Sequence, residues 1–116
     1  MTELKKFVVK KSQWLRGEGP SVLMHRTTHK MCCLGFASLA CGLEENDIFG
    51  VSMPGGVCSD LDLAYPSSFF DGPGRESESI IDIMRINDDL YLNDEERILK
   101  LKQKFNELDI EIIFED

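Results

Sequence analysis

The first apolar run of the chain is short and charged at both ends. Residues 7–9, Phe-Val-Val, stand between lysines, and an aromatic, β-branched run of this length is typical of a strand. Ser12 is the expected N-cap of a brief helical turn over 13–16, which the Gly- and Pro-containing segment 17–20 would end. The chain therefore opens with a predicted strand and a tight turn.

The most apolar segment of the chain covers residues 31–41, eleven residues without a charge. Its apolar and polar positions do not alternate as they would in a half-buried strand, and its alanines and leucine favour helix. Gly42 follows in the position where a glycine commonly ends a helix. The pattern predicts a buried helix over 31–41.

Two more helices are predicted in the last third of the chain. Ser77 is a suitable N-cap for a first helix, which the segment 87–89, Asn-Asp-Asp, would end. Asn93 followed by Glu96 forms the pattern of a capping box for a second helix. That helix carries one apolar stripe at helical spacing, formed by Ile98, Leu101, Phe105 and Leu108. The alternating segment Ile110–Phe114 closes the chain as a strand.

These elements predict an α+β fold. Its small sheet includes the N- and C-terminal strands, and two to three helices pack against it. Residues 1–116 are expected to form a single globular domain, a usual length for one core. The segment at about 50–76 is rich in Gly, Pro, Ser and Asp and predicts a long irregular loop, whose aromatic residues favour contact with the body of the domain.

Composition is that of a globular protein, with 42% hydrophobic and 29% charged residues. The N-terminal apolar run is too short for a signal peptide, and no stretch reaches the roughly 18 apolar residues that a membrane span needs. The four cysteines, Cys32, Cys33, Cys41 and Cys58, are therefore expected to be free thiols in a reducing cytoplasm. These features predict a cytoplasmic protein without a membrane partner.

Charge is distributed unevenly along the chain. Residues 1–42 hold seven basic and two acidic residues, a net charge of +5, whereas residues 43–116 hold six basic and nineteen acidic residues, a net charge of −13. A net charge of −8 for the whole chain argues against direct nucleic-acid binding. Either the two halves face each other within the fold, or an acidic surface meets a basic protein partner.

Residues 30–36, Lys-Met-Cys-Cys-Leu-Gly-Phe, are the first candidate for chemistry, because a helix N-terminus can activate a thiol. Both histidines, His25 and His29, precede the cysteines, so the histidine that would serve as base in a papain-like order is missing. The same four side chains could bind zinc, but adjacent cysteines on a helix point about 100° apart. We expect buried thiols, no catalytic residue, no metal and no cofactor.

Trp14, Arg16, Gly17 and Gly19 form the second candidate. An arginine beside glycines could bind a small anionic ligand such as a signalling nucleotide, with Trp14 stacked on a base. The spacing matches no known phosphate-binding fingerprint. In the alternative interpretation, Trp14 is a core residue and Arg16 pairs with an acidic residue such as Asp88 or Asp89.

The helix over 93–108 carries the third candidate. If its apolar stripe faces the core, Asp94, Glu95 and Glu107 are left to point outward. This helix and the loop before it are the predicted contact surface for a basic partner, which exposed carboxylates would steer onto the chain.

Several motifs together resemble a set of small uncharacterised proteins encoded by bacteriophages and prophages. They are Trp-Leu-Arg-Gly at 14–17, the 30–36 segment, Ile-Asn-Asp-Asp at 86–89, Glu-Glu-Arg at 95–97 and the closing strand 110–114. The resemblance implies an infected bacterial cell as the setting and no particular mechanism. Short phage proteins often disable a host factor, so we expect a non-enzymatic accessory protein that binds and inhibits a host or antiviral-defence factor.

Overall fold

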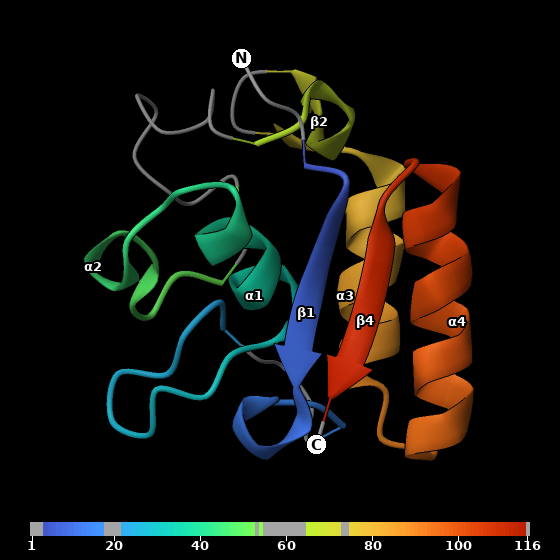
Figure 1. Cartoon of the computed structure of the whole chain (residues 1–116), viewed down its shortest axis with the longest axis horizontal. Helices are drawn as coiled ribbons and strands as arrows, with labels where there is room; N and C mark the ends of the chain where they lie inside the picture. The colour runs from blue at the N-terminus through green and yellow to red at the C-terminus, as the bar shows by residue number, and fades with distance from the viewer. Residues whose placement is uncertain (1–3, 18–21, 53, 55–64, 73–74, 116) are drawn as a thin grey trace.

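The two ends of the chain meet in one sheet. The computed structural model describes residues 4–17, 22–52, 54, 65–72 and 75–115. Strand β1 (Lys6–Lys10) pairs in parallel with β4 (Glu111–Glu115), so that Lys6, Val8 and Lys10 lie opposite Glu111, Ile113 and Glu115 (Figure 1). This pairing confirms the predicted α+β fold with a small sheet that includes the N- and C-terminal strands. The helices between the strands return the chain to the edge where β4 begins, as parallel pairing requires.

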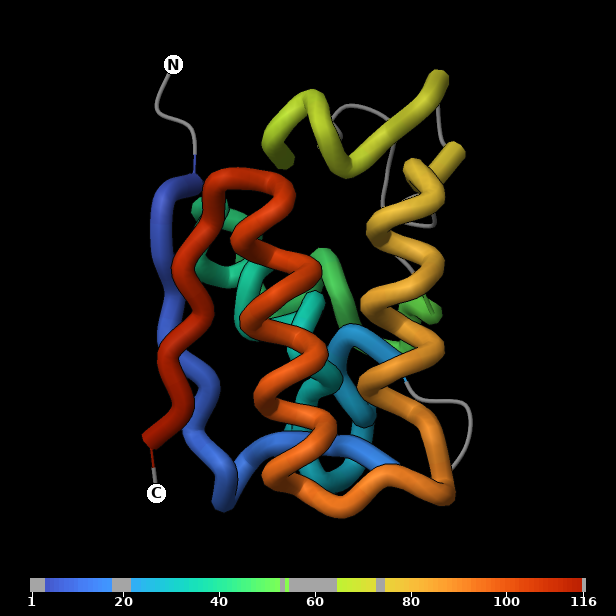
Figure 2. Tube along the Cα trace, turned by 90° about the vertical axis from the view of Figure 1, so that its right-hand side faces the viewer, coloured from blue at the N-terminus to red at the C-terminus, as the bar shows by residue number. Residues whose placement is uncertain are grey.

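The remaining elements follow in chain order between these strands. They are η1 (Lys11–Gln13), α1 (Cys33–Ala40), α2 (Glu45–Ile48), η4 (Ser67–Phe69), β2 (Phe70–Gly72), β3 (Arg75–Glu76), α3 (Glu78–Asp88) and α4 (Asp94–Glu107). Figure 2 shows β1 and β4 at one side of the molecule, with α4 beside them and α3 farther away. No helix among the described residues is long and apolar enough to cross a membrane.

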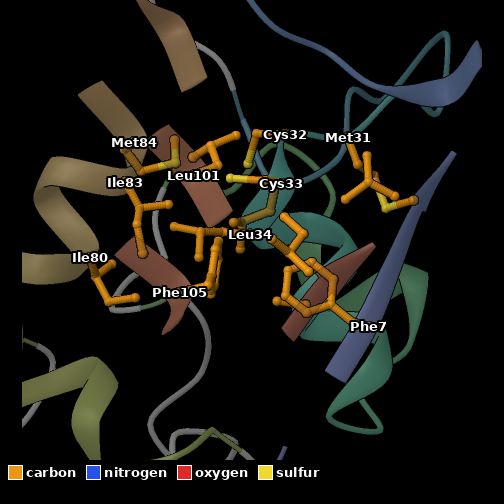
Figure 3. Close-up of a cluster of buried hydrophobic side chains, with 14 of the residues drawn as sticks. Phe7, Met31, Cys32, Cys33, Leu34, Ile80, Ile83, Met84, Leu101 and Phe105 are labelled. Carbon is orange, nitrogen blue, oxygen red and sulfur yellow. The ribbon is translucent and has the colours of Figure 1, made fainter. Parts of the chain in front are cut away.

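The core lies between the sheet and the helices. The ring of Phe7 on β1 packs edge-on against Phe105 of α4, with 5.1 Å between ring centroids. Figure 3 shows Cys33 and Leu34 of α1 among buried side chains of α3 and α4, including Ile83 and Leu101. The uncharged segment predicted as a buried helix therefore supplies the centre of the core.

Helix α1 is shorter than predicted. It begins at Cys33, with Cys32 as its N-cap, whereas the sequence predicted a start at Met31. The N–H of Met31 donates to the carbonyl of Gln13 at 2.9 Å, and the N–H of Leu15 donates to Met31 at 2.7 Å. These two bonds hold Met31 extended beside the N-terminal segment. At the other end, Gly42 has φ +100°, which confirms its predicted role as the helix stop.

The N-terminal turn also differs from its prediction. The helical turn covers Lys11–Gln13, with Lys10 as its N-cap, so Ser12 lies inside it rather than capping it. Trp14 is extended because it forms a bridge with Met31. Both later caps are confirmed, since Ser77 accepts from the N–H of Ile80 and Asn93 forms the capping box of α4 with Glu96.

The predicted loop at 50–76 contains short regular elements among its described residues. Strands β2 and β3 pair in an antiparallel ladder after the turn η4. Tyr65 and Phe69 are buried with their rings stacked at 5.5 Å, which confirms that the aromatic residues of this segment fold back onto the body. Cys58 lies outside the described residues.

Gly35 of α1 generates the first prediction. A Cβ at this position would lie 1.8 Å from the carbonyl oxygen of Leu23, which is a backbone atom and cannot rotate away. We expect Gly35→Ala to lower the free energy of unfolding by about 3 kcal/mol or more, as severe overpacking does. Urea denaturation measures the loss. Gly72→Ala is the control, because no atom lies within 4 Å of its added Cβ; equal losses in both variants would contradict the close approach at Gly35.

Candidate functional site

A buried amide near the end of α3 connects three distant parts of the chain. The Oδ1 atom of Asn87 accepts hydrogen bonds from Trp14 Nε1 at 2.9 Å and from the backbone N–H of Cys33 at 3.1 Å. Its Nδ2 atom donates to the carbonyl of Leu15 and to Asp88 Oδ1, both at 3.0 Å. Asn87 is fully buried. One side chain therefore holds the N-terminal segment, the start of α1 and α3 together.

The backbone of Asn87 extends the same network. Its carbonyl accepts from the N–H of Gly17 at 2.9 Å and from Arg97 Nε at 3.2 Å. Gly17 has φ +66°, and a Cβ there would lie 2.8 Å from Arg97 Nη2. Gly17 is therefore required by its backbone conformation and by the guanidinium that lies against it. We call Trp14, Gly17, Asn87 and Arg97 the Asn87 network.

Arg97 fixes the turn between α3 and α4. Its side chain is 3% exposed, and its Nη2 atom donates to the carbonyls of Asp89 at 2.5 Å and Leu92 at 2.8 Å. The Nη1 atom donates to Leu92 at 3.2 Å and lies 3.5 Å from Asp94 Oδ1. A buried cation bonded to backbone carbonyls on both sides of a turn leaves that turn little freedom.

Sequence reasoning missed the role of Arg97, because a charged residue on an amphipathic helix is normally expected to face solvent. One signal was available. Position 97 precedes Leu101 by four residues and Phe105 by eight, so it belongs to the stripe that faces the core. In the structure Arg97, Leu101 and Phe105 are the buried residues of α4, and Ile98 and Leu108 are partly buried against the core.

Arg16 lies over the ring of Trp14 at the edge of the Asn87 network, and its guanidinium forms hydrogen bonds to other residues of the chain. Its Nε and Nη2 atoms donate to the two carboxylate oxygens of Asp94 at 3.2 and 2.6 Å. Its Nη1 atom donates to the carbonyls of Lys11 and Trp14. The expected pairing of Arg16 with an acidic residue is confirmed. The partner is Asp94 rather than the suggested Asp88 or Asp89, because the first turn of α4 lies beside Arg16.

The candidate anion site predicted from the sequence comprises Trp14, Arg16, Gly17 and Gly19. Trp14 is buried, with the Arg16 guanidinium carbon 4.6 Å from its ring centroid and the Phe114 ring 4.9 Å away. The guanidinium directs its donors at Asp94 and two carbonyls, so an anion would have to displace the Asp94 carboxylate. Gly17 contacts Arg97, and Gly19 lies outside the described residues.

The three carboxylates predicted to meet a partner do not form one patch. Asp94 and Glu95 lie in the first turn of α4, whereas Glu107 is its last residue. Thirteen residues of helix separate Asp94 from Glu107 by about 20 Å along the axis. Glu107 lies 3.8 Å from Lys104, and Asp94 is paired with Arg16. Of the three, Asp94 and Glu95 lie together beside the α3–α4 turn.

The thiols near the start of α1 are buried. Cys32 and Cys33 have no exposed surface, which confirms their predicted burial. Desolvation, together with the neighbouring Cys32 and Asp88, raises the pKa of Cys33 well above its ordinary value. Burial raises the pKa of Cys41 to about 11. These directions are opposite to the lowered pKa that a cysteine nucleophile requires.

The two histidines are not members of the Asn87 network. His25 Nδ1 accepts from the N–H groups of Thr27 and Thr28, and His29 Nδ1 lies 3.8 Å from Glu45. Among the described residues, no three His, Cys, Asp or Glu side chains are grouped so that they could hold a metal ion.

The turn that Arg97 holds presents two large apolar side chains to solvent. Leu90 is 63% exposed and Tyr91 is 94% exposed. The N–H of Tyr91 donates to Asp89 Oδ1 at 2.8 Å, a local bond that further defines the turn. The Asn87 network thus supports an exposed Leu-Tyr pair next to Asp94 and Glu95. We call residues 89–95 the α3–α4 turn surface.

The chain has no detectable match among protein-family models, curated protein sequences or solved structures.

The Asn87 network generates the second prediction. Asn87→Leu keeps a similar volume but leaves Trp14 Nε1, the Cys33 N–H and the Leu15 carbonyl without their partner. Because each unsatisfied buried group costs about 1–3 kcal/mol, we expect the free energy of unfolding to fall by roughly 3 kcal/mol or more. Chemical denaturation followed by Trp14 fluorescence measures it. The exposed Asn106→Leu is the control, and a similar small effect in both variants would contradict a central role for Asn87.

The Arg16–Asp94 pair generates the third prediction. The hydrogen bond from Arg16 is the main cause that lowers the pKa of Asp94. A carboxylate with a lowered native pKa stabilises the fold above its unfolded pKa and loses that contribution as pH falls. We expect Asp94→Asn to be less stable than the parent at pH 7, by about 1 kcal/mol or less because Asp94 is half-exposed.

The stability difference between the parent and Asp94→Asn should then shrink as pH falls below about 4. Thermal unfolding at several pH values measures both effects. Glu95→Gln, one residue farther along α4, is the matched control for loss of a carboxylate in the same helical turn. A difference that stays constant down to pH 2 would show that the pair contributes nothing through its charge.

Proposed function

We propose that this chain is a non-enzymatic binding protein that inhibits a host or antiviral-defence protein in a phage-infected bacterial cell. The setting is proposed from the resemblance of the sequence motifs to phage proteins. Two observations support the binding function. The side chains of Arg16 and Arg97 bond within the chain, and the α3–α4 turn surface exposes Leu90 and Tyr91.

The α3–α4 turn surface is the observation that carries the proposal. Leu90 and Tyr91 are the most exposed of the large hydrophobic residues that the structure describes, and an exposed pair without structural purpose would be a liability. Arg97 fixes the carbonyls on both sides of the pair. A tyrosine presented on a rigid turn loses little conformational entropy when it binds, and tyrosines often dominate the energy of protein interfaces.

The charge around the pair favours a basic partner. Asp88 and Asp89 precede it, and Asp94 and Glu95 follow it. The carboxylate of Asp94 is partly neutralised by Arg16, whereas Glu95 is exposed on the outer side of the same helical turn. A basic protein would be steered to such a surface at low ionic strength. Within this proposal, Leu90 and Tyr91 provide most of the binding affinity, and the carboxylates increase the association rate constant.

Tyr91→Ala tests the proposal and is the fourth prediction. We expect the tagged parent protein to retain one major partner during purification from infected cells, and Tyr91→Ala to lose it by about tenfold or more. The melting temperature should be unchanged, because Tyr91 contributes nothing to the core. Quantitative mass spectrometry measures the recovered proteins and any co-purifying small molecules.

Two variants control this experiment. Ile81→Ala removes a partly exposed side chain on α3, away from the turn, and should retain the partner. Glu95→Lys should slow association at low salt and have less effect at physiological salt, where charges are screened within about 8 Å. Recovery of the same protein by Tyr91→Ala would contradict the proposal, as would recovery of a small anion and no protein.

A further inference from the structure

The sheet of β1 and β4 is unusual, because parallel sheets are normally covered on both faces. Helices α1 and α4 lie against one face, where Phe7 and Ile112 are buried. On the other face Val8 is 39% exposed, and Ile113 beside it is half-buried. The described residues add no third strand to this sheet. Among the described residues, both strands of this sheet are therefore edge strands.

The free edge of β4 can be assigned from the ladder. The N–H of Glu111 donates to Lys5 of the β1 side at 2.8 Å. Successive residues of a strand direct their backbone groups to alternate sides. Glu111, Ile113 and Glu115 thus face β1, whereas the N–H and C=O groups of Ile112 and Phe114 face the opposite edge.

A groove follows this edge. It has a volume of about 740 Å³ and is lined by the consecutive residues 109–114, by Lys102, Gln103 and Asn106 of α4, and by Lys5. Since side chains alternate between the two faces of a strand, a groove that touches the four consecutive β4 residues Glu111–Phe114 runs along the strand's edge. The space beside β4 is therefore open where an added strand would lie, with α4 as its far wall.

The charges of β4 define the strand that would fit. Its outer face carries Glu111 and Glu115 on either side of Ile113. The strand already paired with it, β1, places Lys6, Val8 and Lys10 opposite these three residues. Opposite charges and β-branched pairs across neighbouring strands stabilise a sheet. A second strand on the free edge meets the same pattern of acidic, apolar and acidic residues.

A second copy of the chain is a poorer occupant. Antiparallel pairing of two β4 strands about Ile113 would place Glu111 of one copy opposite Glu115 of the other, which is destabilising. Each copy also carries a net charge of −8, so association of two copies is opposed over a longer range. The carboxylates on the outer face of β4, Glu111 and Glu115, favour a basic segment of another protein.

We propose that the free edge of β4 binds, by strand addition, an extended segment of a partner protein that carries Lys or Arg on both sides of a β-branched residue. Backbone bonds to Ile112 and Phe114 would provide affinity, and Glu111 and Glu115 would select the basic side chains. This surface is separate from the α3–α4 turn surface, and the inference holds whether or not Tyr91 contacts a partner.

A peptide with the sequence of residues 5–11, Lys-Lys-Phe-Val-Val-Lys-Lys, is the probe, blocked at its N-terminus with a dye and amidated at its C-terminus. We expect fluorescence anisotropy to detect binding to the full chain that weakens about tenfold between roughly 20 and 300 mM salt. A peptide with glutamate at the four lysine positions should not bind. A peptide carrying Val8→Pro keeps its charge but cannot extend a ladder, and should bind at least about tenfold more weakly.

Two variants of the protein locate the binding. Gln103→Trp places a bulky side chain in the groove and should weaken binding about tenfold or more, whereas Lys100→Trp, on another side of α4, should stay within about twofold of the parent. Equal binding of the lysine and Val8→Pro peptides would overturn strand addition, as would equal binding by the two tryptophan variants. Concentration-dependent self-association that Gln103→Trp abolishes would assign the edge to a second copy and also overturn the proposal.

Discussion

The hydrogen bonds of Asn87 are the interaction on which the rest of this structure depends. A buried primary amide has donors and an acceptor that must all be satisfied, and those of Asn87 reach Trp14, Leu15 and Cys33. Its backbone carbonyl adds Gly17 and Arg97. Segments separated by more than 50 residues are thereby fixed relative to one another. The specificity of this arrangement comes from the directions of the bonds, which apolar packing alone would not impose.

This network gives the sequence motifs a structural explanation. Residues from the segments 14–17, 30–36, 86–89 and 95–97 all take part in it, through Trp14, Cys33, Asn87 and Arg97. The motifs that the sequence suggests as candidate sites are therefore connected to one another by hydrogen bonds. Arg16 directs its donors at Asp94 and backbone carbonyls, and Cys33 lies fully buried. Among the described residues, the proposed contacts for a partner are side chains that the network orders and side chains along the open sheet.

The two proposed surfaces differ in physical character. The α3–α4 turn surface is a short segment whose order comes from the buried guanidinium of Arg97. The edge of β4 is an extended surface whose affinity would come from main-chain groups and whose selectivity would come from Glu111 and Glu115. Both surfaces carry carboxylates near apolar side chains, which is consistent with the net charge of −13 in residues 43–116. Basic partners are favoured in each case.

The sequence by itself determined the elements whose causes are local. The capping residues Ser77 and Asn93, the stop at Gly42 and the two terminal strands follow from side chains and spacing within a few residues. Tertiary structure decided the rest. Met31 is extended and Ser12 caps no helix, because bonds between Gln13, Leu15 and Met31 override local propensity. The partner of Arg16, the burial of Arg97 and the opening beside β4 depend on which segments lie together, a long-range property that spacing along one chain does not encode.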